Sequence, residues 1–241
     1  MKEDVLNVFC PAVFLRGYFL GADKMQTKTK NIALSGLLCA LSYIVMLVSK
    51  IIPEVSGFLQ LDLKDVIIVS GGFILGPFYA LIISVVVSLM EFITIGSTGI
   101  IGMIMNVVST AAFCCVASDV YRKWHSLNGA IWGLIAATIS LTAVMLLWNY
   151  YITPLYMKVP REAIKAMLLP VFLPFNLLKG LINSALTLIL YRPLKTALSK
   201  TGFLRKKDNA QKKKLMPIAF IVGICILAVC IPYFMHLLGL I

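Results

Sequence analysis

The sequence predicts an all-α integral membrane protein, a bundle of six transmembrane helices followed by an additional, seventh C-terminal helix. Of the 241 residues, 60% are hydrophobic and 13% are charged, whereas charged residues make up roughly 25% of a typical soluble domain. The hydrophobic residues gather in long runs, and many of the 22 Lys and Arg residues, set against 10 Asp and Glu, lie between these runs. This composition disfavours a soluble domain. The net charge of +12 then indicates basic cytoplasmic loops and not a nucleic-acid partner.

Seven apolar runs are candidate membrane spans, because a helix needs about 20 apolar residues to cross a bilayer. The second run is short and passes through Gly71, Gly72 and Gly76 to Pro77, so it is either a compact span closed by a tight turn or the first arm of a helical hairpin. The seven ranges are Asn31–Ile52, Val66–Leu75, Phe78–Ile95, Ile100–Val120, Ala130–Ile152, Leu168–Leu190 and Pro217–Ile241.

These runs divide the chain into an N-terminal leader (1–28), a six-helix membrane domain (29–195), a basic cytoplasmic linker (196–216) and an additional C-terminal transmembrane helix (217–241). The leader has no small-residue cleavage site, so we do not expect a secretory signal. The stretch from Arg192 to Lys214 carries nine basic residues against one acid, Asp208. Lys and Arg concentrate in cytoplasmic loops, which predicts a cytoplasmic N-terminus. The cluster could also bind anionic lipid, although a flank that fixes topology explains it more simply.

Polar residues recur inside the spans at helical spacing. Each one costs a few kcal/mol at the bilayer centre unless it is paired or faces a wet cavity. In three spans the most polar members lie toward the outer side, so we expect Glu91, Asn149, Asn176 and Lys179 to share a ligand-binding cavity. Lys179 needs an anion or several acceptors, and Glu91 is the acid well within a span that could serve it. The four stripes are Ser84, Ser88 and Glu91; Asn106 and Ser109; Thr138, Thr142, Met145 and Asn149; and Asn176, Lys179 and Asn183.

The residue types in this predicted cavity indicate the chemistry of its ligand. A carboxamide is both donor and acceptor, so Asn149 and Asn176 can pair with a ring edge that alternates C=O and N–H groups. A membrane-interface belt explains any one of the nearby aromatic residues, but together they can sandwich a planar ring. We therefore expect a planar heterocycle whose hydroxyls or polar tail meet Glu91 and Lys179. The aromatic residues are Trp148, Tyr150, Tyr151, Tyr156, Phe172 and Phe175.

Motifs of catalysis are missing from the sequence. It contains no G-x-x-x-x-G-K-[ST], no H-E-x-x-H and no G-x-S-x-G. The six cysteines and two histidines do not fall at metal-ligand spacing. We therefore expect a protein that is not an enzyme, with no catalytic residue, no metal site and no cofactor.

Small residues in the first span form a candidate docking surface. Gly36 and Ala40 stand four residues apart, a small-xxx-small spacing that lets the backbone of another helix approach closely. Internal packing is the simpler explanation of each such spacing when it is taken singly. The position of this one near the cytoplasmic side favours a partner protein.

Five sequence stretches resemble the substrate-binding S components of energy-coupling-factor (ECF) vitamin transporters, most closely the riboflavin-specific ones. The resemblance covers about Thr29 to Lys195, and its last two stretches are the more specific. The stretches are IALSGLLCAL (Ile32–Leu41), LDLKDVIIVSGGFILGP (Leu61–Pro77), GIIGMIMN (Gly99–Asn106), WNYYITP (Trp148–Pro154) and LPFNLLKGLINS (Leu173–Ser184).

The resemblance implies a six-helix bundle that binds riboflavin in an extracellular cavity, partly covered by the loop between the first two helices. It implies flavin contacts from Asn149, Asn176 and Lys179, ribityl contacts from Glu91, and weaker assignments for Leu59 and Asp62 in that loop.

The resemblance also implies partners. It implies docking through Gly36 and Ala40 onto a membrane coupling protein with two ABC-type ATPases, although glycine replaces the family's first alanine. The leader and the seventh span have no counterpart in the family pattern.

Alternatives remain open at this point. An S component for FMN or another vitamin would have the same features, and Lys158, Arg161 and Lys165 could attract a phosphate. A membrane enzyme or assembly factor using the same cavity would need an acid/base or metal pair, and Glu91 is the carboxylate that the predicted spans offer.

Overall fold

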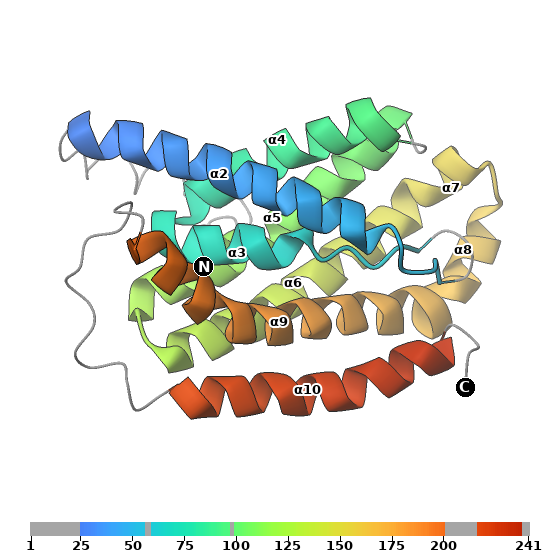
Figure 1. Ribbon diagram of the computed structural model, residues 1–241. Coiled ribbons are helices and arrows are strands. Elements are labelled where there is room, and N and C mark those ends of the chain that lie inside the picture. The colour runs from blue at the N-terminus through green and yellow to red at the C-terminus, as the bar shows by residue number, and fades with distance from the viewer. Residues whose placement is uncertain (1–24, 56–58, 97–98, 201–215, 238–241) are drawn as a thin grey trace, which may run out of the picture. The chain divides into compact units, whose positions relative to one another are not determined.

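The computed structural model describes residues 25–55, 59–96, 99–200 and 216–237, and within these ranges the chain is helical and has no β-strand (Figure 1). The predicted all-α class is confirmed. Residues from Leu34 onward form one compact unit. The helices are α2 (Met25–Ser49), α3 (Lys64–Leu75), α4 (Pro77–Ile95), α5 (Gly99–Trp124), α6 (Leu127–Tyr151), α7 (Thr153–Met157), α8 (Arg161–Met167), the π-helical turn η1 (Leu168–Phe172), α9 (Leu173–Lys200) and α10 (Met216–Leu237).

Five helical stretches among the described residues are long and apolar enough to cross a membrane, so the chain is a multi-pass membrane protein. The second predicted span, α3, has 12 residues, which gives about 18 Å of helix against a hydrocarbon core about 30 Å thick. The described apolar part of the seventh, α10, is Ile221–Met235. The five stretches are Thr29–Ser49, Pro77–Ile95, Gly99–Trp124, Leu127–Leu155 and Arg161–Leu198.

The short helix α3 is the first arm of a helical hairpin with α4. Gly76 between them has φ 101, in the region that favours glycine, and its N–H donates to Gly72 O at 2.8 Å. Pro77 then occupies the first turn of α4, where its fixed φ and missing N–H are tolerated. Of the two forms predicted for this glycine-rich run, the structure has the hairpin.

The helix α3 lies at the centre of the bundle, where it packs against α4, α5 and α9. Ten of its residues, from Lys64 to Phe73, are buried. Gly72 allows this close packing, because a Cβ there would lie 2.0 Å from Ser118 Oγ. Burial in protein instead of lipid explains why a helix too short to span is nevertheless so apolar.

Close packing of α6 against α9 brings two of the polar stripes together. A Cβ on Gly180 of α9 would lie 2.6 Å from the Thr138 side chain of α6, so only glycine fits at this contact. Thr138 Oγ1 also lies 3.3 Å from Ser184 Oγ. Asn149 lies three turns beyond Thr138 on α6, and Asn176 and Lys179 lie just before Gly180 on α9.

A π-helical turn precedes the polar stripe of α9. Pro170 and Pro174 remove two backbone donors, and the Leu173 N–H donates to Leu168 O in the wider π pattern. This turn places Phe172 O where Asn176 Nδ2 donates to it at 2.8 Å.

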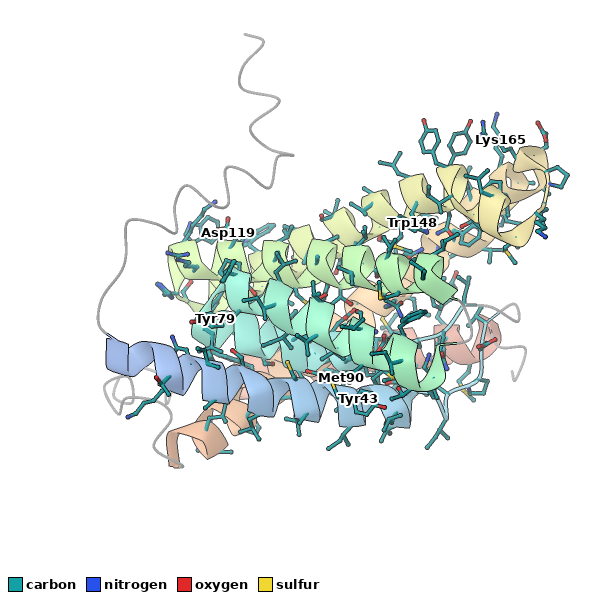
Figure 2. All side chains as sticks on the ribbon, turned by 90° about the horizontal axis from the view of Figure 1, so that it is seen from above. Tyr43, Tyr79, Met90, Asp119, Trp148 and Lys165 are labelled. Atoms are coloured by element: carbon teal, nitrogen blue, oxygen red, sulfur yellow. The ribbon has the colours of Figure 1, made fainter. Side chains whose placement is uncertain are left out.

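The predicted cytoplasmic and outer ends of the helices lie apart in Figure 2, where Tyr79 and Asp119 are at one end and Trp148 and Lys165 at the other. At the first end, Lys123 pairs with Asp119 at 2.8 Å on the surface of α5. Residues 1–24 of the predicted leader and residues 201–215 of the predicted basic linker lie outside the described residues.

Candidate ligand-binding cavity

A cavity with an empty volume of about 1020 Å³, part of it open to solvent, lies among α2, α4, α5, α6, α9 and the loop of residues 50–63 that joins α2 to α3, here called loop 1. The six residues predicted to bind ligand all line it: Leu59, Asp62, Glu91, Asn149, Asn176 and Lys179. The polar stripes therefore do converge on one space, and every member of the α4, α6 and α9 stripes is buried.

The parts of loop 1 that the structure describes, residues 50–55 and 59–63, are held at the wall of this cavity. The N–H groups of Val55 and Leu59 donate to each other's carbonyl oxygens at 2.8 and 3.0 Å, which closes a small antiparallel bridge. From α9, Asn183 Nδ2 donates to Asp62 O at 3.1 Å. These contacts direct Leu59 and Asp62 toward the cavity.

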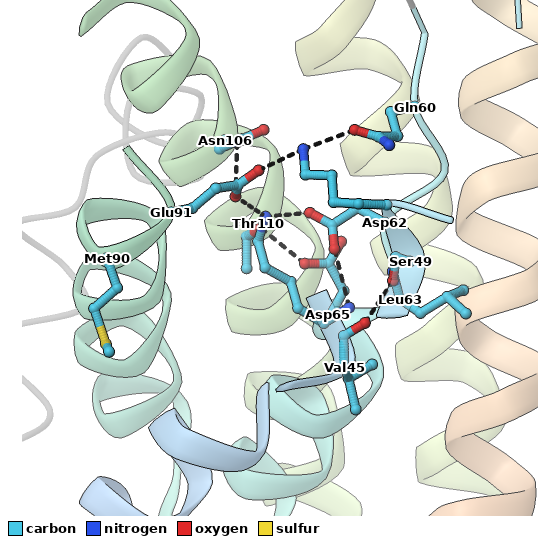
Figure 3. Close-up of polar contacts among 12 residues, drawn as sticks. Val45, Ser49, Gln60, Asp62, Leu63, Asp65, Met90, Glu91, Asn106 and Thr110 are labelled. Carbon is cyan, nitrogen blue, oxygen red and sulfur yellow. Dashed lines mark hydrogen bonds and ion pairs between the residues drawn. The ribbon is translucent and has the colours of Figure 1, made fainter. Parts of the chain in front are cut away.

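Glu91 is the centre of a buried charged network (Figure 3). Its Oε1 pairs with Lys50 Nζ at 2.9 Å, and its Oε2 pairs with Lys64 Nζ at 2.9 Å and accepts from Asn106 Nδ2 at 3.1 Å. Met90, its neighbour on α4, points away from the network. Two cations and one amide thus satisfy Glu91, which the sequence had suggested as the partner of Lys179.

The Lys64 ammonium joins loop 1 to α4. Its side chain is fully buried and also pairs with Asp62, whose carboxylate accepts the Lys64 backbone N–H at 3.1 Å. Lys50 completes the connection by donating to Gln60 Oε1 at 2.7 Å. Burial alone would raise the pKa of the Asp62 carboxyl, but the Lys64 and Lys179 ammonium groups outweigh it and hold that pKa below its ordinary value.

Asp65 is a third buried carboxylate, after Asp62 and Glu91, and it directly precedes the second predicted span. It is fully buried in the first turn of α3, and its Oδ1 accepts from Thr110 Oγ1 at 2.8 Å. Its Oδ2 has no hydrogen-bond partner within the described ranges. Glu91 is therefore not the only carboxylate inside the bundle, although Asp65 does not line the cavity.

The two amide side chains predicted to bind ligand are held by their own helices. Asn149 Nδ2 donates to Met145 O at 2.7 Å, and its Oδ1 accepts from Thr153 Oγ1 at 2.8 Å. Asn176 donates to Phe172 O, and its Oδ1 accepts no hydrogen bond from any residue the structure describes. Both side chains are therefore fixed at the cavity wall, and Asn176 keeps a free acceptor there.

Lys179 differs from the other two lysines near the cavity. Its side chain lies in the wall and is 9% exposed. Among the described residues it makes no hydrogen bond and no ion pair within 4 Å, whereas Lys50 and Lys64 both pair with Glu91. A buried ammonium without a direct partner is costly unless a ligand or water accepts from it. Lys179 is therefore the cation that this cavity offers to a ligand.

Two further hydroxyls face the cavity without partners. Ser88 of α4 and Ser109 of α5 are buried, line the cavity, and have Oγ atoms that make no hydrogen bond within the part of the chain described. They extend the polar surface from Glu91 and Asn106 toward the interior of the bundle.

The apolar wall differs from the prediction. Of the expected aromatic residues whose side chains the structure describes, only Phe175 lines the cavity, and the sequence did not single out Phe92, which also lines it. Trp148 packs against the main core, and Tyr151 is 55% exposed. The side chain of Tyr156 lies outside the described residues. Aliphatic and thioether groups supply the rest of the wall: Met46, Leu59, Leu61, Ile95, Met103, Met105 and Met145.

The sequence analysis missed Lys50, Gln60 and Lys64 as parts of this site. Lys50 begins loop 1 and Lys64 directly follows it, and charge at such positions is typical of a solvent-exposed span boundary. One signal was present: the LDLKD stretch places three charges within four residues next to an apolar helix, and charge so close to a span is paired when it is buried.

Comparison with known proteins identifies the architecture. The family described as "ECF transporter, substrate-specific component" matches residues 30–191. A solved structure titled "Structure and mechanism of the S component of a bacterial ECF transporter" superposes with a TM-score of 0.61 and 28% identity, covering 71% of this chain and 98% of that one.

Curated relatives match over nearly their whole length. The "Riboflavin transporter RibU" of Staphylococcus aureus is 30% identical over 73% of this chain and 95% of its own length. The "Riboflavin transporter RibU" of Streptococcus thermophilus is 30% identical over 82% of this chain and 95% of its own length. The "Riboflavin transporter FmnP" of Bacillus subtilis is 24% identical over 70% of this chain and 93% of its own length.

Proposed function

Because this chain belongs to the family of ECF transporter substrate-specific components, we propose that it captures riboflavin at the outer side of the cell membrane and delivers it to an ATP-driven ECF transporter for import. Its similarity to riboflavin transporters of three bacteria supports this substrate. The observation that carries the proposal is the cavity, in which an amide oxygen and an ammonium group, neither directly paired with any residue that the structure describes, lie beside apolar walls.

The cavity offers riboflavin two kinds of contact. Phe92, Phe175 and the methionine side chains can cover the faces of a planar ring, while Asn149, Asn176 and Lys179 can meet its alternating donors and acceptors. Glu91 already contacts the Lys50 and Lys64 ammonium groups and accepts from Asn106, and a carboxylate has about four lone-pair sites, so one remains for a ribityl hydroxyl.

The charges of the cavity favour a neutral ligand over a phosphorylated one. Asp62 and Glu91 are neutralised by lysines, and Glu54 adds a further carboxylate to the lining. Lys158, Arg161 and Lys165, considered above as an attraction for phosphate, do not line the cavity. A phosphate would therefore meet the Lys179 ammonium, which has no direct partner within the described ranges, and the negative charge of Glu54. We expect riboflavin to bind more tightly than FMN.

The partners follow from the family. We propose a membrane coupling protein and two ABC-type ATPases, docking at Gly36 and Ala40. Both residues are exposed, and a Cβ on Gly36 would meet nothing within 4 Å, so the face is open to a partner helix. The orientation proposed is a cytoplasmic N-terminus with the cavity outside.

The proposed division of the chain keeps a leader (1–28), the S-component domain (29–195), a basic linker (196–216) and a further C-terminal helix (217–241). The family match to residues 30–191 supports the boundaries of the S-component domain.

The test is fluorescence titration of the purified protein with riboflavin, followed by competition with FMN. We expect tight binding with flavin quenching. Asn176→Ala should weaken binding by more than tenfold, because it removes the amide at the cavity wall. Asn128→Ala, an exposed amide in the first turn of α6, is the matched control and should leave the affinity unchanged. Lack of binding by the unaltered protein would overturn the proposal. Equal affinities for Asn176→Ala and Asn128→Ala would place the ligand elsewhere.

A further inference from the structure

The last helix of the chain, α10, lies outside the stretch matched by the S-component family, which ends at residue 191. It packs along α9, the helix that carries Asn176 and Lys179 (Figure 1). A Cβ on Gly223 would lie 2.8 Å from Ile189 Cγ1 and 3.0 Å from Ala185 O. Such close backbone approach is typical of a permanent helix contact within a membrane protein.

The far end of α10 joins an apolar cluster that also contains loop 1. Cys230 and Phe234 of α10 are 5% and 7% exposed. They are buried in one cluster with Val55 and Leu61 of loop 1, and with three residues of α9: Phe175, Leu178 and Ile182. The cluster therefore connects three segments that are distant in the sequence.

This cluster forms the back of the cavity wall. Leu59, Leu61 and Phe175 all line the cavity, and all three belong to the cluster or pack against it. The opposite side of α10 is exposed, with Val229 at 73% and Tyr233 at 49%. One side of α10 thus supports the cavity wall, and the other is free to face lipid.

We propose that α10 holds loop 1 closed over the substrate cavity, with Phe234 as the positioning residue that acts through Leu61 and Phe175. Loop 1 forms one side of the cavity, so its displacement would widen the opening through which a ligand leaves. Every apolar contact that α10 adds to the closed position lowers the population of the open one. The helix therefore slows release of the bound substrate without touching it.

The kinetic part of this inference rests on the proposed function, and the test is the dissociation rate of riboflavin from the full-length protein, measured by stopped-flow fluorescence. Phe234→Ala should raise the dissociation rate about tenfold, because it removes the aromatic ring from the apolar cluster behind loop 1. Phe234→Leu should stay within about twofold of the unaltered protein, since it keeps most of the apolar contact. Tyr233→Ala, which removes a neighbouring aromatic ring from the exposed side of the same helix, is the matched control and should change nothing.

A second readout needs no ligand. Hydrogen exchange at the Val55 and Leu59 amides, which close the loop 1 bridge, should become faster in Phe234→Ala while exchange in α4 and α5 is unaltered. Uniformly faster exchange would show a merely structural role and overturn the proposal. Unchanged exchange and an unchanged dissociation rate would also overturn it. If the unaltered protein binds no riboflavin, the proposed function fails, yet the exchange experiment still tests α10.

Discussion

Replacement of Lys64 by methionine tests the charged network that joins loop 1 to α4. The ammonium is fully buried and contacts Asp62 and Glu91. Removing one member of a buried ion pair costs about 3–5 kcal/mol, because a buried charge loses its partner. Glu91 keeps Lys50 at 2.9 Å and Asn106 at 3.1 Å, so we expect the lower end of this range, about 3 kcal/mol.

The measurement is thermal unfolding of the purified protein in detergent. A loss of about 3 kcal/mol should lower the Tm by roughly 6–12 °C for a chain of this length. Lys123→Met is the matched control, because it breaks an ion pair with Asp119 whose side chains are 68% and 41% exposed. Exposed pairs contribute about 0–1 kcal/mol, so the control should shift the Tm by no more than a few degrees.

A double-mutant cycle separates the ion pair from general damage to packing. When Glu91→Gln accompanies Lys64→Met, the combined loss should be smaller than the sum of the two single losses by about 1–3 kcal/mol, because the second change removes a charge that the first left unpaired. Strict additivity, or a Lys64→Met effect as small as that of Lys123→Met, would refute the reasoning.

Two further changes test the loop and the helix packing. Because the pKa of Asp62 is depressed in the folded protein, its carboxylate stabilises the fold fully above the unfolded-state pKa of about 3.9 and loses this contribution as the pH falls through the lower folded pKa. Asp62→Asn should therefore flatten the fall in Tm below about pH 4. A dependence of Tm on pH identical to that of the unaltered protein would contradict this. Gly180→Ala would place a Cβ 2.6 Å from the Thr138 side chain. It should lower the free energy of unfolding by about 1–3 kcal/mol, measured by thermal unfolding. It should also weaken riboflavin binding, measured by titration. Gly36→Ala, where the Cβ meets nothing within 4 Å, is the control for that change, and equal Tm values for the two variants would be inconsistent with close packing of α6 and α9.

The sequence was sufficient to predict the buried polar stripes, because burying polar groups in a membrane protein is costly and their periodicity therefore reports which side of a helix faces inward. Glu91, Asn149, Asn176 and Lys179 were predicted in this way, and all of them line one cavity. The resemblance to the family supplied Leu59 and Asp62, which no periodicity could have selected in an irregular loop.

The charged network could not be predicted, since it depends on contacts between distant positions. Lys50 stood near the end of the first predicted span and Lys64 between the first two spans, positions at which charge normally marks the end of a span. Their partner Glu91 lies 41 and 27 residues further along the chain, and only the path of loop 1 brings the three together. The same limit explains why the aromatic residues of the cavity wall were not predicted correctly: Phe92 lines the cavity, whereas Trp148 packs against the core.

The position of each contact shows which ones would break in the proposed opening of loop 1. Asp62 and Lys64 are two residues apart, so their ion pair can persist while the loop moves. The pairs of Lys50 and Lys64 with Glu91, and the hydrogen bond from Asn183 to the Asp62 carbonyl, cross between loop 1 or its end and other helices. The proposed opening would therefore separate loop 1 from Glu91 and Asn183 as well as from the apolar cluster behind Leu61. The ionic and apolar contacts act on different sides of one loop, so weakening either set should raise the open population without changing the groups that meet the ligand.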